Sequence, residues 1–244
     1  MRAAAVPISD VRAVWTPALH RSSAAGTAVR GTMPDQNYPS PALSHRRADM
    51  AVHLVGLVLI VLAGSALIGT AAARLDSAQV IAVVIYAAAA LASNLASWAY
   101  HFLPWHSRRV LLRRIDHAAI YPSISGTFTP FFVQADTTWT LVLLWLCWGL
   151  TALAIVNKIT NKTVKSRWST ASYLGLGAIG LSALPDMRDV PLATLWCILG
   201  GALCYVVGTV SYARKAMRFR YAIWHACVNA GGILMFAGIW LALF

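Results

Sequence analysis

The chain has 244 residues, of which 59% are apolar and only 11% are charged, whereas an ordinary soluble domain has about 25% charged residues. This composition argues against a soluble enzyme and favours an integral membrane protein. The formal net charge of +12 would suggest nucleic acid binding in a soluble protein. Here long uncharged stretches separate the basic clusters, so we expect no nucleic acid partner.

The first 45 residues are rich in Ala, Ser, Pro and Arg and contain no apolar run long enough for a span or a signal peptide. We predict a disordered or non-native tail over residues 1–45, with Met33 as an alternative start. A membrane domain is predicted to follow over residues 46–244. An acid-poor leader with Arg and Ser is also typical of an organelle transit peptide. We therefore expect the plasma (cell inner) membrane, or an organelle membrane if residues 1–32 are such a peptide.

Seven apolar stretches are long enough to cross a bilayer, because a helical span needs roughly 20 apolar residues and lipid cannot satisfy a bare backbone. The predicted spans are approximately residues 50–73, 78–104, 116–134, 138–157, 169–185, 190–212 and 221–244. The connections between them are short. The sequence thus predicts an all-α membrane protein, a bundle of seven transmembrane helices.

Basic residues predict the orientation of this bundle. Eighteen of the 20 Lys and Arg residues fall before the first span or in every second loop, and the opposite loops hold only Arg74 and Arg188. The basic side is expected to be cytoplasmic, so the N-terminus lies inside and the C-terminus outside. Membrane lipids, including anionic lipids at the basic loops, are the expected partners. Nothing in the pattern indicates an oligomeric state.

Polar side chains cluster at one predicted depth. An ionisable group near the bilayer centre costs about 2.5–3.5 kcal/mol on insertion scales, which makes each one a functional candidate. In the predicted topology the inner ends of four spans carry such groups: Asp49 and His53; Ser93, Ser97 and His101; Asp116 and His117; and Tyr221, His225 and Asn229.

Two histidines and a carboxylate at one depth suit Zn²⁺, which takes nitrogen and oxygen ligands in a tetrahedral arrangement. Asp116 is a candidate general base for a zinc-bound water, and Ser97 a candidate for orienting a ligand or a substrate oxygen. Structural roles stay open for some of these groups. His53 is also explained as a hydrogen-bonded histidine between helices, and Asp116 as an interfacial partner of Arg113 and Arg114.

Several stretches resemble the hemolysin III family, which belongs with the adiponectin and progestin receptors in one seven-helix superfamily. The resemblance covers residues 44–240 and is carried by ADMAVHLVG, ASWAYHFLP, RRIDHAAIYPSISGTFTP, LGGALCYVVGTVSY and AIWHACV. It implies seven helices with the N-terminus inside and a zinc site near the inner leaflet. By this resemblance the metal residues are His101 and His225, with Asp116 contacting the metal through water and Ser97 in the SxxxH motif.

Tyr221 departs from the family pattern, because it stands where the receptors have the first histidine of HxxxH. A phenol with a pKa of about 10 is a poor zinc ligand at neutral pH. Three arrangements remain open. Asp116 completes the site directly, Tyr221 binds as phenolate, or the site is weak or empty and leaves a hydrogen-bonded cluster. Two smaller departures are His45, where the family usually has an acidic residue, and Pro122, which is expected to kink its helix.

Three hypotheses about function follow. The first is a zinc-dependent hydrolase of a membrane lipid amide or ester, because the relatives are associated with ceramidase-like activity. In this hypothesis Asp116 takes a proton, and Tyr221 or Ser97 donates to the oxyanion. The second is the membrane-perturbing or pore-forming activity that the family name implies. The third is a non-catalytic receptor for membrane homeostasis with a degenerate metal site.

Overall fold

Seven α-helices form the part of the chain that the computed structural model describes, residues 38–160 and 166–244. They are α1 (Leu43–Arg74), α2 (Ser77–Phe102), α3 (Arg109–Ala135), α4 (Thr138–Thr160), α5 (Ser166–Leu181), α6 (Leu192–Ala213) and α7 (Arg220–Leu243). Two short 3₁₀ helices, η1 (His106–Arg108) and η2 (Leu184–Asp186), lie in the connections. The described residues contain no strand, which confirms the all-α prediction. Residues 1–37 of the predicted tail lie outside the described residues.

Five of the helices, α1, α2, α4, α6 and α7, are long and apolar enough to cross a membrane. The other two differ for separate reasons. α5 has only 16 residues, fewer than a straight span needs. α3 is more polar, but it packs against α2, α4, α5 and α7, and the eight residues from Ser125 to Phe132 are buried. The side chains of this stretch therefore face other helices, where polar groups are tolerated.

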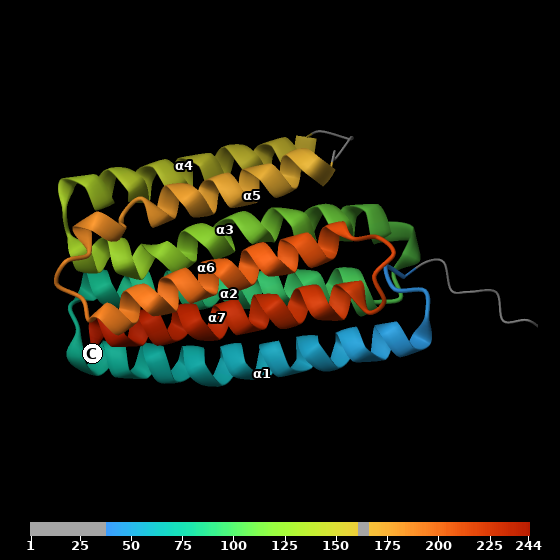
Figure 1. Cartoon of the computed structure of the whole chain (residues 1–244), viewed down its shortest axis with the longest axis horizontal. Helices are drawn as coiled ribbons and strands as arrows, with labels where there is room; N and C mark the ends of the chain where they lie inside the picture. Colours follow the sequence, from blue (N-terminus) through green and yellow to red (C-terminus); the bar gives the residue numbers. More distant parts are fainter. Residues whose placement is uncertain (1–37, 161–165) are drawn as a thin grey trace, which may run out of the picture. The chain divides into compact units, whose positions relative to one another are not determined.

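Successive helices run in alternating directions, so that one end of the bundle holds the start of α1, the end of α2 and the starts of α3 and α7 (Figure 1). α1 packs against α2 and α7, and α6 packs against α7. α1 and α3 begin at Leu43 and Arg109, earlier than the predicted spans. The predicted boundaries follow the apolar stretch, whereas the helical backbone continues through the charged residues before it. That this end faces the cytoplasm stays a prediction from the charges.

Two aspartates mark helix ends, Asp76 at the start of α2 and Asp136 at the end of α3. Asp76 caps α2, because its side chain accepts hydrogen bonds from the backbone N–H groups of Ala78 and Gln79 at 2.8 and 3.0 Å. Asp136 ends α3 in the left-handed region, with φ of 47°, a conformation that Asp tolerates better than most residues.

Pro122, predicted to kink α3, lies within a helix that continues from Arg109 to Ala135.

A close approach of α1 to α7 positions the polar end of the bundle. Gly56 lies against Asn229, and a Cβ atom on this glycine would be 2.5 Å from the Asn229 side-chain oxygen. The Asn229 amide donates a hydrogen bond to the Val52 carbonyl at 2.9 Å. A helical carbonyl already accepts one bond, so this second bond joins the two helices without breaking α1. The glycine thus lets α1 bring its first turns next to α7.

Replacing Gly56 with Ala should separate these helices, because the added methyl group displaces Asn229 and its hydrogen bond. We expect the free energy of unfolding to fall by about 1–3 kcal/mol, the usual cost of overpacking. Gly69→Ala in the same helix is the matched control, since no atom lies within 4 Å of its added Cβ. There the better helix propensity of Ala should leave stability unchanged or slightly higher. Unfolding in mixed micelles measures both. Equal effects at the two positions would contradict the close approach.

Candidate metal centre

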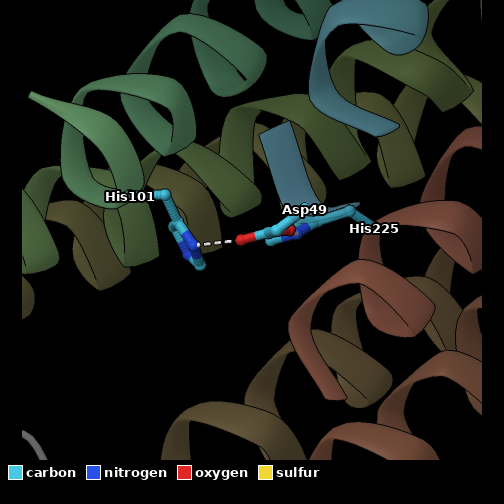
Figure 2. Close-up of side chains that lie close together, drawn as sticks. All are labelled: Asp49, His101 and His225. Carbon is cyan, nitrogen blue, oxygen red and sulfur yellow. Dashed lines mark hydrogen bonds and ion pairs between the residues drawn. The ribbon is translucent and has the colours of Figure 1, made fainter. Parts of the chain in front are cut away.

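Asp49, in the second turn of α1, is the centre of a buried polar cluster. Its side chain is fully buried, and a buried carboxylate is costly unless hydrogen-bonded partners surround it. One carboxylate oxygen accepts a hydrogen bond from Nδ1 of His101 at 2.7 Å, and the other accepts one from Nδ1 of His225 at 2.7 Å. Figure 2 shows the two imidazoles approaching Asp49 from different helices. A single carboxylate thus connects α1, α2 and α7.

His53 lies one helical turn after Asp49 on the same face of α1. Its Nδ1 donates to the main-chain carbonyl of Asp49 at 2.9 Å and lies 3.4 Å from a carboxylate oxygen of the same residue. A carbonyl can only accept, so in the neutral ring the proton is on Nδ1 and Nε2 is an acceptor. The Ser97 hydroxyl, 3.0 Å from this Nε2, is therefore the donor.

Ser97 and His101 share a face of α2 because they are four residues apart. The Ser97 oxygen lies 3.0 Å from Nε2 of His53 and 3.4 Å from Nε2 of His225. These two nitrogens therefore face a common point beside the serine. The SxxxH spacing predicted in α2 thus has a geometric effect, because it presents a hydroxyl and an imidazole to the same cluster.

The cluster forms part of the wall of a partly open cavity of about 450 Å³. The polar lining at this end includes His53, Ser97, His101 and His225, whereas Asp49 is not part of the lining. Further along, the wall is mainly apolar and includes Ile124, Phe128, Leu174, Leu181 and Met235. The imidazoles therefore face the cavity, and the carboxylate lies behind them.

Asp116 and Tyr221 line the same cavity but lie outside this hydrogen-bonded cluster. The Asp116 carboxylate is 3.9 Å from Nδ1 of His117, and that nitrogen donates to the Arg113 carbonyl at 2.7 Å. The Tyr221 ring packs edge-on against His101, with centroids 5.0 Å apart, and Arg220 lies over its face at 4.6 Å. Tyr221 therefore contributes an aromatic wall next to His101.

The structure brings together Ser97, His101 and His225, which the sequence assigns to the site, with Asp49 and His53, which the sequence lists only among the polar groups at the same depth. The central role of Asp49 was not predicted. A signal for it was present, because Asp49 and His53 are one turn apart at the predicted depth of the other polar groups. Choosing between Asp49 and Asp116 as the central carboxylate needed the contacts between helices.

A metal ion fits this donor set. Asp49, His101 and His225 each offer a ligand atom, and these atoms all lie within 4.8 Å of one another. Imidazole nitrogens and carboxylate oxygens are ligands of Zn²⁺ and of other divalent transition metals. The three residues are buried, and the cavity gives access to the neighbouring rings. The cluster could therefore hold a metal ion.

Fold and site together define a multi-pass, all-helical integral membrane protein with a buried Asp/His/His cluster at one end of its bundle. Residues 45–236 match the family described as "Haemolysin-III related". The chain belongs to the hemolysin III family, within the superfamily that includes the adiponectin and progestin receptors.

Two curated relatives match over most of their length. The chain is 31% identical to "Hemolysin-3 homolog" of Bacillus subtilis (strain 168) over 191 residues, which are 78% of this chain and 90% of that protein. It is 29% identical to "Hemolysin-3" of Bacillus cereus over 195 residues, 78% of this chain and 87% of that protein. The resemblance identified from the sequence motifs is thereby confirmed.

Replacing Asp49 with Ala should destabilise the metal-free protein far more than replacing Asp116 with Ala. Asp49 is fully buried and its loss leaves two imidazoles without their acceptor, which typically costs about 3–5 kcal/mol. Asp116 retains 15% side-chain exposure and one long ion pair, so its loss should cost about 1 kcal/mol or less. Unfolding in the presence of a chelator measures both values. Similar losses would contradict the central position of Asp49.

Proposed function

We propose that this hemolysin III family protein is a zinc-dependent hydrolase of a membrane lipid amide or ester. The observation that carries the proposal is the position of the Asp49–His101–His225 cluster at the polar end of a largely apolar cavity. Such a cavity can hold an acyl chain along its apolar wall and place the amide or ester carbonyl beside the histidines. Pockets of this kind, mostly apolar with a few convergent polar groups, are typical of ligand sites.

The chemistry of the donor set supports zinc. Zinc accepts two or three imidazoles with a carboxylate nearby, and a catalytic site keeps one position open. When bound, the ion would lower the pKa of a water molecule towards neutrality and polarise a carbonyl group. The cavity supplies the space that an open position requires.

The side chains around the cavity supply the remaining steps. Water adds to the carbonyl carbon, and Asp116, which lines the cavity outside the buried cluster, accepts its proton. The Tyr221 hydroxyl donates to the carbonyl oxygen as negative charge develops there, and the Ser97 hydroxyl joins it by turning from Nε2 of His53. Asp116 then returns the proton to the leaving nitrogen or oxygen as its bond to carbon breaks. The products are a fatty acid and the amine or alcohol of the lipid.

Purified protein in mixed micelles tests this proposal directly. We expect stoichiometric zinc by elemental analysis, and release of fatty acid from ceramide or a matched lipid ester that stops when zinc is chelated. His101→Ala and His225→Ala should lose both zinc and activity. Asp116→Asn should keep zinc and lose about 10²–10⁴-fold in kcat, the usual contribution of a general base.

Asp189→Asn is the control, because Asp189 is exposed in the loop before α6, away from the cavity lining. It should retain both zinc and activity. Hydrolysis that is unaffected by the chelator, or protein that binds zinc without hydrolysing any acyl amide or ester, would contradict the proposal.

A second candidate function is membrane permeabilisation, which the names of the two relatives support. Dye release from protein-containing vesicles separates it from hydrolysis when wild type is compared with Asp116→Asn. On the hydrolase proposal, dye release should be absent or lower in the variant, because membrane damage then depends on lipid cleavage. Equal release by both proteins would favour permeabilisation.

A further inference from the structure

Two tyrosine hydroxyls at the polar end of the cavity are open to a ligand. Tyr100 of α2 and Tyr212 of α6 both line this cavity. Among the described residues, neither hydroxyl makes a hydrogen bond, and neither is among the polar atoms that are buried without a partner. Because a phenol hydroxyl donates hydrogen bonds, the two tyrosines offer donors that a bound molecule can use.

Guanidinium groups lie beside these tyrosines. The Arg220 guanidinium lies over the ring of Tyr212 at 5.3 Å and over that of Tyr221 at 4.6 Å. Arg113 of α3 is close enough to Tyr100 and Tyr212 to interact with both electrostatically. Within the described part of the chain, neither arginine forms an ion pair with a carboxylate. The forked donors of a guanidinium group match the oxygens of a phosphate group.

The local balance of charge favours an anion. Lys158, at the end of α4, is a third cation near Arg113, and its amine donates a hydrogen bond to the Ser169 hydroxyl, which lines the cavity. Of the described carboxylates, only that of Asp116 lines the same cavity. Three cations therefore lie around this end of the cavity, and one carboxylate opposes them. Since basic side chains near a membrane surface attract anionic headgroups, an anionic ligand is favoured over a neutral one.

The tyrosines lie next to the candidate metal centre. Tyr100 precedes His101 in α2, and the centroids of the two rings are 5.0 Å apart. The Tyr221 ring also lies 5.0 Å from that of His101, and the Tyr212 ring lies 5.9 Å from that of Tyr221. Because three bonds of an extended chain span at most about 3.6 Å, roughly four to six bonds join a carbonyl beside the histidines to an anion at the tyrosines. An ethanolamine or glycerol linker has this length.

We infer that a cluster of two arginines and two tyrosines binds the phosphate group of a lipid headgroup. The members of this arginine–tyrosine cluster are Arg113, Arg220, Tyr100 and Tyr212. The inference rests on the proposed function for the position of the acyl carbonyl. It narrows the substrate class to acyl lipids in which a short linker joins the amide or ester to a phosphate, such as an acylated glycerol phosphate. A neutral acyl lipid of the same chain length is the poorer ligand.

Ether-linked analogues test the inference without hydrolysis, because an ether has no carbonyl group. An alkyl glycerol phosphate is compared with the neutral alkyl glycerol of the same chain length by isothermal titration in neutral micelles. We expect the wild-type protein to bind the phosphate analogue at least about 10-fold more tightly, since one hydrogen bond to a charged group corresponds to roughly 10–100-fold in affinity. Equal affinities would overturn the inference, and this comparison needs no variant.

Variants test whether the arginine–tyrosine cluster holds the phosphate. Arg113→Gln and Arg220→Gln should each weaken binding of the phosphate analogue by about 10-fold or more and leave binding of the neutral analogue unchanged. Arg214→Gln is the matched control, because Arg214 is exposed directly after α6, outside the cavity lining, and its loss removes the same charge from the same end of the bundle. This control should bind both analogues as the wild type does. Equal losses in all three variants would overturn the inference, because attraction to the basic surface would then explain the binding.

Inorganic phosphate distinguishes a lipid headgroup from a free anion, since the two have the same phosphate chemistry. It should displace the alkyl glycerol phosphate only at concentrations far above the dissociation constant of that analogue, because it has no chain to pack against the apolar wall. Displacement at concentrations close to that constant would overturn the assignment to a lipid.

Activity separates this inference from the proposed function. A protein that prefers the phosphate analogue but hydrolyses no acyl lipid would leave the phosphate site standing and remove the proposed function. Hydrolysis of a neutral and a phosphorylated acyl lipid with equal kcat/KM, together with equal binding of the two analogues, would leave the proposed function standing and overturn the inference.

Discussion

The buried carboxylate of Asp49 is the constraint on which the polar end of this bundle depends. A fully buried carboxylate is tolerated only when its oxygens accept hydrogen bonds. Here the donors are imidazoles from α2 and α7, and a third imidazole, from α1, lies nearby. Satisfying one group therefore fixes the relative positions of three helices. Hydrogen bonds to a charged acceptor are also stronger and shorter than neutral ones, which suits a site whose rings must not turn.

The rest of the fold allows this arrangement. Gly56 lets α1 approach α7, and Asn229 joins the two helices through the Val52 carbonyl. On the other side, α3 brings its polar face into the bundle, where it lines the cavity with Asp116, Ser123 and Thr127. A helix too polar to face lipid thus becomes one wall of the internal space. The same packing buries Asp49 and leaves the imidazoles accessible, because the rings lie between this carboxylate and the cavity.

Asp49 and Asp116 can have different roles because they lie in different environments. Asp49 is buried behind the imidazole rings, and Asp116 lies at the cavity wall. Asp49 accepts hydrogen bonds from rings that it orients, whereas Asp116 keeps partial exposure and lies 3.9 Å from Nδ1 of His117. The first environment suits a fixed anion. The second suits a group that exchanges protons with a substrate, as the proposed hydrolysis requires. Family membership relates the chain to Bacillus proteins named hemolysin-3 but does not assign these roles.

The sequence by itself determined the all-helical membrane fold, the seven helices and the family, because apolar length and short motifs are local properties. Residues four apart share a helix face, so the sequence also predicts that Asp49 lies beside His53, and Ser97 beside His101. What only the tertiary structure decided is that Asp49, rather than Asp116, meets the histidines. That choice depends on how each helix is rotated about its axis and how closely its neighbours approach. Both are set by contacts such as that between Gly56 and Asn229, which no spacing along the chain encodes.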